Sequence, residues 1–190
     1  MTGSIVTDQL PTRERILDAA LTLFADRGYD ATSMREIAEQ LGMTKAALYY
    51  HFDSKADIVR TMLAETEQKV AELAAWTREQ PPGPTLARTV LGRWSDIMQA
   101  CGLAAFRFVV ANRKVIDELS PDDHGGMHAC LGELYELLAP PGASVETQLR
   151  IRIALNAITM AGLVGTDIDA DDSEILAAAR RLSLDLLPEG

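Results

Sequence analysis

The sequence contains few of the residues from which active sites and metal sites are built. Its 190 residues include two cysteines, without Cys-x-x-Cys spacing, and three histidines. It has no glycine-rich phosphate loop, no Gly-x-Ser-x-Gly motif and no plausible Ser/His/Asp set. General acid–base catalysis therefore has little to work with, and we expect no enzyme and no cofactor.

Long apolar runs and secretion signals are also missing. No apolar run approaches the roughly 20 residues that a membrane helix needs. Residues 1–10 lack the basic start and apolar core of a signal peptide, and we expect them to form a flexible arm. We expect a cytoplasmic protein with no membrane partner, in which Cys101 and Cys130 are reduced, partly buried thiols. The alternative for this pair is a redox-switch disulfide.

Positive charge is scarce as well. Lys and Arg number 18 against 28 Asp and Glu, for a net charge of −10. Residues 1–57 carry 6 cations and 9 anions, and residues 58–190 carry 12 and 19. This balance excludes a protein held on nucleic acid by a broad basic surface. Charges beyond about 8–10 Å are screened at physiological salt, so a few well-placed cations can still act locally.

What the chain does have is an apolar content of 47%, enough for a packed core without disulfides or metal. Its length suits a small module plus one larger domain. Helical spacing of apolar residues recurs along the chain, and we expect an all-α fold.

The segment from Thr32 to Lys55 predicts two short helices joined by a tight turn. Ser33-Met34-Arg35-Glu36 matches a capping box, which begins the first helix. Gly42 ends that helix, and Thr44 supplies the N-cap of the second. A turn this short is typical of a helix-turn-helix. The alternative is a plain helical corner with a solvated polar face.

The second helix of this segment has distinct faces. Leu48 and Phe52 are four residues apart and face inward. Thr44 and Lys45 lie at the N-terminal end, where such helices meet base edges. The remaining side chains expected to reach phosphates are Tyr49, His51 and Lys55. Amides at the start of the next helix, near Ser54, would suit an anion.

Arg13 to Ile58 resembles the N-terminal domain of the TetR family of bacterial transcriptional regulators. The most specific part of the match is Leu48-Tyr49-Tyr50-His51-Phe52 followed by Ser54-Lys55. The resemblance implies a homodimeric, all-α regulator, usually a repressor. It also implies release of a DNA operator when a small molecule binds the C-terminal domain.

The resemblance also implies which residues touch DNA. Carried over position by position, these are Ser33, Thr44, Lys45, Tyr49, His51 and Lys55, and we add Ala47 and Tyr50 of the same helix to the predicted DNA-binding residues. Ala46 and Ala47 depart from the family pattern, in which Gly followed by Thr or Ser is common. Ala47 cannot donate a hydroxyl contact, although its methyl could meet a thymine methyl.

The remaining helices divide the chain into a DNA-binding domain, residues 11–57, and a helical ligand-binding and dimerisation domain, residues 58–190. A first helix capped by Thr12 runs to about Asp26 and completes the DNA-binding domain. A long helix from Ser54 to about Gln80 then leads to a Pro81-Pro82-Gly83-Pro84 break. Further helices are expected after this break, one of them opened by Ser120-Pro121.

The last two predicted helices, about Val145–Val164 and Ser173–Leu187, are rich in small residues. Small side chains permit close helix approach, and we expect the two helices to form a four-helix bundle with a second subunit. The residues predicted at that interface are Ala154, Ala157, Ala161, Ala178 and Leu182. The alternative is an intramolecular hairpin that buries the same faces.

We expect the large side chains of the second domain to form its hydrophobic core, and some of them could line an effector pocket together with a few polar groups. The predicted pocket residues are Trp94, Met98, Phe106, Asn112, His128 and Tyr135. His124 and His128 are four apart, as in a helical zinc site, but two glycines separate them. We therefore expect no metal.

The helix-turn-helix pattern predicts DNA binding, and the family resemblance implies a ligand-responsive repressor that binds a palindromic operator as a homodimer. Its partners would be double-stranded DNA, a small-molecule effector and a second copy of the chain. The alternative is a helical small-molecule or metal-binding protein that has kept the fold without reading DNA.

Overall fold

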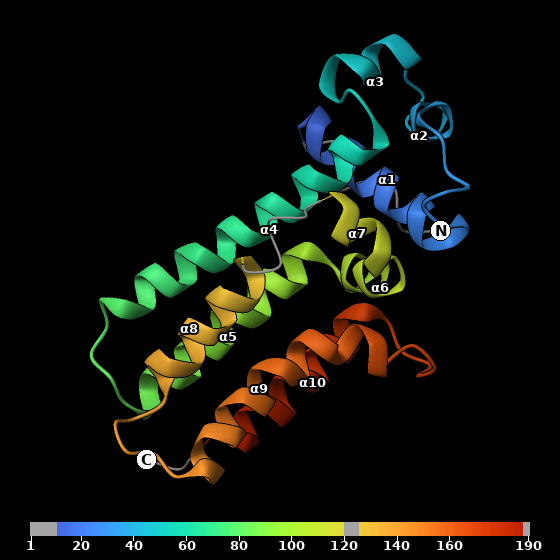
Figure 1. Ribbon diagram of the computed structural model, residues 1–190. Coiled ribbons are helices and arrows are strands. Elements are labelled where there is room, and N and C mark those ends of the chain that lie inside the picture. The colour runs from blue at the N-terminus through green and yellow to red at the C-terminus, as the bar shows by residue number, and fades with distance from the viewer. Residues whose placement is uncertain (1–10, 120–125, 188–190) are drawn as a thin grey trace.

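The computed structural model describes residues 11–119 and 126–187, and within these ranges the chain is helical with no strand. The prediction of an all-α fold is therefore confirmed. The helices are α1 (Thr12–Arg27), α2 (Met34–Gln40), α3 (Lys45–His51), α4 (Lys55–Arg78), α5 (Pro84–Cys101), α6 (Leu103–Ala111), α7 (Arg113–Leu119), α8 (Gly126–Leu138), α9 (Val145–Val164) and α10 (Asp172–Leu186). Figure 1 shows α1–α3 at one end, α4 leading away from them, and α9 and α10 at the other end.

Most helix starts lie where the sequence predicts them, because the caps are local. The Ser33, Thr44 and Ser54 side chains each accept a hydrogen bond from a backbone N–H in the first turn of α2, α3 and α4. The predicted cap at Thr12 is wrong. Pro11 is the N-cap of α1, and it makes no side-chain cap bond.

Asn112 separates α6 from α7, where the apolar stripe of the sequence shows no break. Its backbone leaves the helical region at φ −114°, ψ 30°, and its side-chain Nδ2 donates to the Phe108 carbonyl at 2.9 Å. An asparagine that bonds its own backbone competes with helix continuation. The arm at residues 1–10 and the helix opening at Ser120-Pro121 lie outside the described residues, and the described part of α8 begins at Gly126.

The apolar residues gather in two clusters, one for each end of the molecule. The body cluster draws on α4, α5, α6, α8, α9 and α10 around Trp94, Leu134 and Ile158. The second cluster lies in the N-terminal module, which comprises α1–α3, and we call it the module core. It is centred on Ile16, Ile37, Leu48 and Phe52. This module core also includes Ile58 and Val59 of α4 and Phe108 of α6, so packing crosses the boundary predicted between residues 57 and 58.

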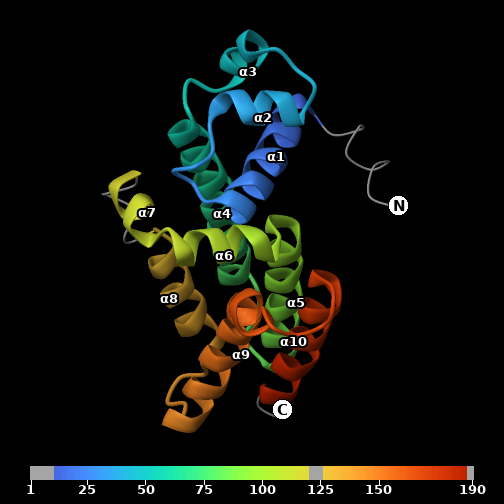
Figure 2. The same ribbon diagram turned by 90° about the vertical axis from the view of Figure 1, so that its right-hand side faces the viewer.

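The helices α9 and α10 form a C-terminal hairpin, and its small residues pack against other helices of the same subunit. A Cβ on Gly162 would lie 3.1 Å from the Leu103 carbonyl oxygen, and one on Gly165 would lie 2.8 Å from Ile175 Cγ2. Glycine therefore permits the α6–α9 and α9–α10 approaches, both visible in Figure 2. Ala154 and Ala161 are buried in the body cluster, so their assignment to a subunit interface is wrong and the intramolecular alternative holds for them. The other three predicted residues are Ala157 and Ala178, half-buried, and Leu182, exposed.

Trp94 and Met98, predicted to line a pocket, belong to the body cluster instead. The Trp94 side chain is fully buried, and its Nε1–H donates to the Leu155 carbonyl at 3.2 Å. This bond joins α5 to α9. The Leu155 carbonyl and the indole N–H are both buried, so this hydrogen bond is electrostatically stronger than a solvent-exposed one.

Replacing Trp94 with Phe should lower the free energy of unfolding by about 1–3 kcal/mol, since a buried carbonyl loses a donor and a void opens. Chemical denaturation measures this directly. Trp76→Phe is the control, because Trp76 is half-buried beneath the Arg93 guanidinium. An equal loss in both variants would show that the α5–α9 bond contributes nothing of its own.

Candidate nucleic-acid interface

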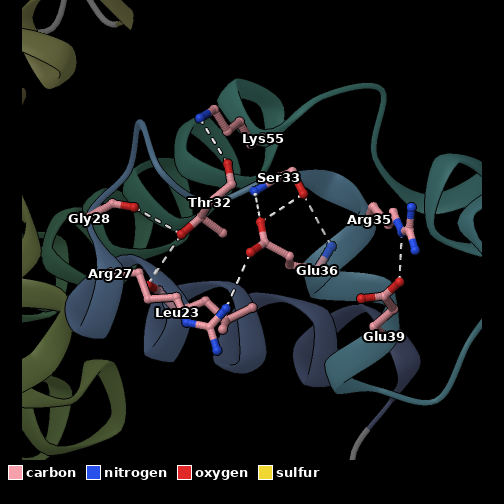
Figure 3. A network of polar contacts seen from close by, with 9 residues as sticks. All are labelled: Leu23, Arg27, Gly28, Thr32, Ser33, Arg35, Glu36, Glu39 and Lys55. Carbon is pink, nitrogen blue, oxygen red and sulfur yellow. Dashed lines mark hydrogen bonds and ion pairs between the residues drawn. The ribbon is translucent and has the colours of Figure 1, made fainter.

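The loop between α1 and α2 is bonded onto α1. Thr32 is buried, and its hydroxyl lies within hydrogen-bond distance of two carbonyls, 2.8 Å from Gly28 O and 3.3 Å from Leu23 O. Figure 3 shows this hydroxyl pointing down at the end of α1. The residue that precedes the α2 cap therefore has a fixed position.

The predicted capping box begins α2 as expected. Glu36 N donates to Ser33 Oγ at 3.3 Å, and Ser33 N donates to Glu36 Oε2 at 2.8 Å. The other Glu36 oxygen accepts from Arg27 Nη1 of α1 at 3.2 Å (Figure 3). These hydrogen bonds hold the pKa of the Glu36 carboxyl below its usual value: the Ser33 hydroxyl contributes most, then the Ser33 amide, with Arg27 adding less.

The turn between α2 and α3 is short because Gly42 takes a positive φ of 63°. Met43 N then donates back to Ala38 O at 3.0 Å, and Thr44 Oγ1 accepts from Ala47 N at 3.1 Å. Leu48 and Phe52 fix α3 in the module core, with 0% and 2% of their surfaces exposed. The rest of α3 is left facing outward.

The outward face of α3 carries aromatic and basic groups. Tyr50 is 86% exposed and Tyr49 41%, which is unusual for large aromatic side chains. The Lys45 ammonium lies 5.4 Å from the Tyr49 ring centroid, and the Tyr50 and His51 rings meet edge to face at 5.2 Å. Six of the eight predicted DNA-contacting residues therefore lie on or at the start of one short helix: Thr44, Lys45, Ala47, Tyr49, Tyr50 and His51.

Lys55, predicted to contact a phosphate, has another role in this structure. Its ammonium lies 2.6 Å from Tyr29 O, 3.0 Å from Thr32 O and 3.4 Å from Asp30 O. The same ammonium stands 4.3 Å from the Tyr29 ring centroid. An ammonium has three donors, so a phosphate contact would require one of these carbonyls to be released.

The start of α4 is likewise occupied by the chain's own groups. Ser54 Oγ accepts from Asp57 N at 3.1 Å, and Asp57 Oδ2 accepts from Asp53 N at 3.3 Å. The carboxylate of Asp57 sits in the first turn, where it interacts favourably with the helix dipole and would repel a phosphate. The anion site predicted near Ser54 is thus filled by a side chain.

Three arginines of the module, Arg13, Arg27 and Arg35, are paired with carboxylates. Arg35 pairs with Glu39 at 2.7 Å along α2, and Arg13 pairs with Glu65 of α4. Lys45 consequently stands out on the face of α3, with an aromatic ring rather than a carboxylate as its described neighbour.

The predicted effector residues do not surround a common cavity. Asn112 caps α6, as described above, and Tyr135 Oη accepts from Asn156 Nδ2 at 2.7 Å. Phe106 is half-buried, and the side chain of His128 lies outside the described residues. A hollow of about 310 Å³ lies instead between α4 and α5, lined by Lys69, Glu72, Leu73, Arg93, Asp96 and Ile97. Sequence reasoning missed it because charged residues on a helix surface give no pocket signal.

A smaller hollow of about 70 Å³ adjoins the first at Lys69, where α1 meets α4 and α5. Cys101 lines it, with Sγ 3.4 Å from Thr66 Oγ1, and is not joined to Cys130 in a disulfide. Among the described residues there is no group of three or more His, Cys, Asp or Glu that could hold a metal ion, and His124 lies outside them. In the same residues, no helix has the length and apolarity needed to cross a membrane.

Comparison with known proteins identifies the module. Residues 16–62 match the family described as bacterial regulatory proteins, tetR family. By this match, the chain is similar to TetR-family regulators in its N-terminal module. It is 38% identical over 76 residues to the HTH-type transcriptional regulator AcrR of Shigella flexneri, covering 40% of this chain and 35% of AcrR. It is 50% identical over 46 residues to the biofilm operon icaADBC HTH-type negative transcriptional regulator IcaR of Staphylococcus aureus, covering 24% and 25%.

The similarity to these TetR-family relatives thus spans about a third of AcrR and a quarter of IcaR. Solved structures extend the likeness of fold over the rest of the chain. A TetR-family regulator from Marinobacter aquaeolei VT8 superposes with a TM-score of 0.65 at 19% identity, covering 94% of this chain and 100% of the other. The fatty acid degradation regulator FadR from Bacillus halodurans gives a TM-score of 0.60 at 17% identity, covering 93% and 96%.

The Glu36→Gln variant should make the TetR-type module less sensitive to acid. Folding favours the ionised Glu36, so its contribution is present above the unfolded pKa of about 4.3 and is lost as pH falls through the lower folded pKa. Denaturation curves from pH 7 to pH 3 should show wild type more stable at pH 7 and the difference closing at low pH.

The matched control is Glu39→Gln, which removes one charge from α2 without touching the capping box. A wild-type advantage over Glu36→Gln that stays constant down to pH 3 would contradict the assignment.

Proposed function

We propose that the protein is a transcriptional repressor that binds a palindromic DNA operator as a homodimer. One observation carries the proposal: a short helix, α3, whose apolar side is fixed in the module core while Lys45, Tyr49 and Tyr50 face outward. The family that the module matches, and the similarity to the transcriptional regulators AcrR and IcaR, support it.

The dimensions of α3 suit a major groove. Seven residues at about 1.5 Å each make a helix roughly 10 Å long and with side chains about 10–12 Å wide, close to the groove width of about 12 Å. In this pose Thr44 and Lys45 meet base edges, and Ala46 and Ala47 allow close approach. The hydroxyls of Tyr49 and Tyr50, with His51, reach the flanking phosphates, whereas the Ser33 hydroxyl donates to Glu36 Oε2 at 2.8 Å.

The acidity of the chain implies that affinity depends on geometry more than on charge. With net charge −10 and the module's arginines largely paired, nonspecific DNA binding should be weak and its salt slope shallow. Two modules on one dimer, placed on half-sites about 34–36 Å apart, supply the specificity instead.

The dimer contact we propose is an exposed apolar stripe on α9. Val145, Leu149 and Ile153 repeat every four residues and are 74%, 50% and 50% exposed. Met160 and Val164 of α9 and Leu182 of α10 are exposed as well. Exposed large apolar residues repeated along one helix are typical of an interaction site, and two copies could cover them as a four-helix bundle. Ala157 and Ala178, which are half-buried, lie on the same pair of helices.

Charges placed in this stripe should separate the subunits. Leu149→Glu combined with Ile153→Glu should give a monomer at micromolar concentration, because a partner would bury two unpaired carboxylates. Light scattering after size exclusion measures the mass, and circular dichroism checks that helix content is kept. Val110→Glu, an exposed apolar position on α6, should remain dimeric. A monomeric wild type, or a dimeric double variant, would contradict the proposed interface.

Selection of bound sequences from random DNA duplexes tests DNA reading itself. We expect a palindromic consensus, and absence of enrichment would favour a helical binding protein that keeps the fold without reading DNA. On the selected operator, Tyr49→Phe and Tyr50→Phe should each weaken binding at least about tenfold, because each subunit of the dimer loses a hydrogen bond to a charged phosphate. Tyr135→Phe removes a hydroxyl from the body and should bind as wild type does; equal affinity in all three would contradict the phosphate roles.

We also propose that the repressor responds to a small molecule bound in the body. Support comes from the hollow between α4 and α5, which combines apolar Leu73 and Ile97 with four charged side chains. The helix α4 runs from this hollow to the module. An effector must bind the DNA-competent and released arrangements with different affinity to shift the balance between them.

A further inference from the structure

We propose that the hollow between α4 and α5 binds a small organic carboxylate with an apolar body, and that Arg93 holds its anionic head. The inference names the chemical class of the effector, and to that extent it rests on the proposed function. The hollow, of about 310 Å³, brings four charged side chains together with apolar Leu73 and Ile97. The pairing of those charges indicates which ligand fits.

Both carboxylates of the hollow already have polar partners. Asp96 Oδ1 lies 3.3 Å from Arg180 Nη1, in an ion pair that joins α5 to α10. Glu72 Oε1 accepts from Gln68 Nε2 at 2.8 Å along α4. A cationic ligand would have to compete with these contacts, so the acidic side chains are not where we place the charge of the ligand.

The two cations of the hollow, Lys69 and Arg93, are paired differently. Neither has a carboxylate within ion-pair distance in residues 11–119 and 126–187. With Arg180, three cations meet two carboxylates here, which is a local excess of positive charge in a chain of net charge −10. An anion would therefore be attracted to this place and would find donors that no carboxylate of the chain occupies.

The Arg93 side chain is already placed for a carboxylate. Its guanidinium carbon lies 3.6 Å from the centroid of the Trp76 ring. At this distance the guanidinium must lie flat on the ring, because an edge-on approach would press its nitrogen atoms into the ring carbons. Its N–H donors then point outward in the guanidinium plane, where two of them can bind both oxygens of one carboxylate. Stacking on Trp76 also reduces the side-chain freedom that binding would remove.

The apolar part of the hollow gives the ligand its second property. Leu73 is buried in the body cluster, and Ile97 packs against that cluster, so the two side chains form a fixed apolar floor. An inorganic anion would leave this floor in contact with water, whereas a carboxylate with an apolar body would cover it. Lys69 lines the hollow from α4 and supplies a second positive charge.

Titration of the wild-type protein with benzoate, benzamide and benzylamine tests the preference for an anion. The three probes share one ring and differ in charge. Benzoate should bind roughly tenfold more tightly than benzamide, because only the carboxylate gains charge-assisted hydrogen bonds from Arg93. Benzylamine should bind more weakly than benzoate. Isothermal titration calorimetry gives the affinities, and equal binding of benzoate and benzamide, or a preference for benzylamine, would overturn the inference.

Substitutions on α5 test the role of Arg93. Arg93→Gln should remove the preference for benzoate over benzamide, and Arg93→Lys, which keeps the charge but not the planar fork, should retain only part of it. The matched control is Arg88→Gln, the same change at an exposed position of α5 outside the hollow, which should bind as wild type does. An unchanged preference in Arg93→Gln would contradict the assignment.

The two tryptophans of the chain report where the probe binds. In a proton–nitrogen correlation spectrum, benzoate should shift the indole signal of Trp76, which lies against Arg93, and leave that of buried Trp94 unchanged. Trp76→Phe assigns the two signals. A shift of the Trp94 signal alone would place the ligand elsewhere and overturn the inference.

These measurements use no DNA, so the two proposals can fail separately. A protein that prefers benzoate through Arg93 but selects no operator consensus would overturn the proposed function and support the anion site. A protein that selects a palindromic consensus but binds benzoate no better than benzamide would overturn the anion site alone.

Discussion

The helix-turn-helix end of this protein depends on the contacts of the Lys55 ammonium. It sits against three carbonyls of the loop that joins α1 to α2, and against the ring of Tyr29. Carbonyls in such a loop have no helical partner and must be satisfied by other groups. Because α2 and α3 have seven residues each, they are too short to persist alone and rely on such tertiary ties. One cation thus joins the start of α4 to the start of α2 and leaves α3 facing outward.

This arrangement makes the reading module continuous with the body. Phe108 closes the module core from α6, while Ile58 and Val59 close it from α4. The charge pattern agrees with a module held rigidly on the body, since a chain with net charge −10 cannot depend on general attraction to phosphates. In the proposed complex with DNA, the aromatic and basic groups on α3 supply the selectivity, and the packing of α4 and α6 against the module core holds them in place.

What could be predicted from the sequence was local. The capping box at Ser33 and Glu36, the Thr44 and Ser54 caps and the Gly42 turn depend on residues within a few positions of one another, and they were found where expected. The apolar spacing that gave α9 and α10 is local as well. What failed was long-range: Lys55 meets carbonyls more than twenty residues away, and Trp94 donates across 61 residues. Ala154 has the small side chain of an interface residue, and only tertiary packing shows that it lies against its own subunit.

The salt dependence of operator binding by Lys55→Met tests the central claim most directly. Methionine keeps most of the length of the side chain and removes its charge and donors. If Lys55 holds the loop, affinity should fall because α2 and α3 lose their support, and the slope of log affinity against log salt should stay that of wild type. If Lys55 instead neutralises a phosphate, the slope should become shallower by about 0.9 for each subunit, and that result would contradict the account.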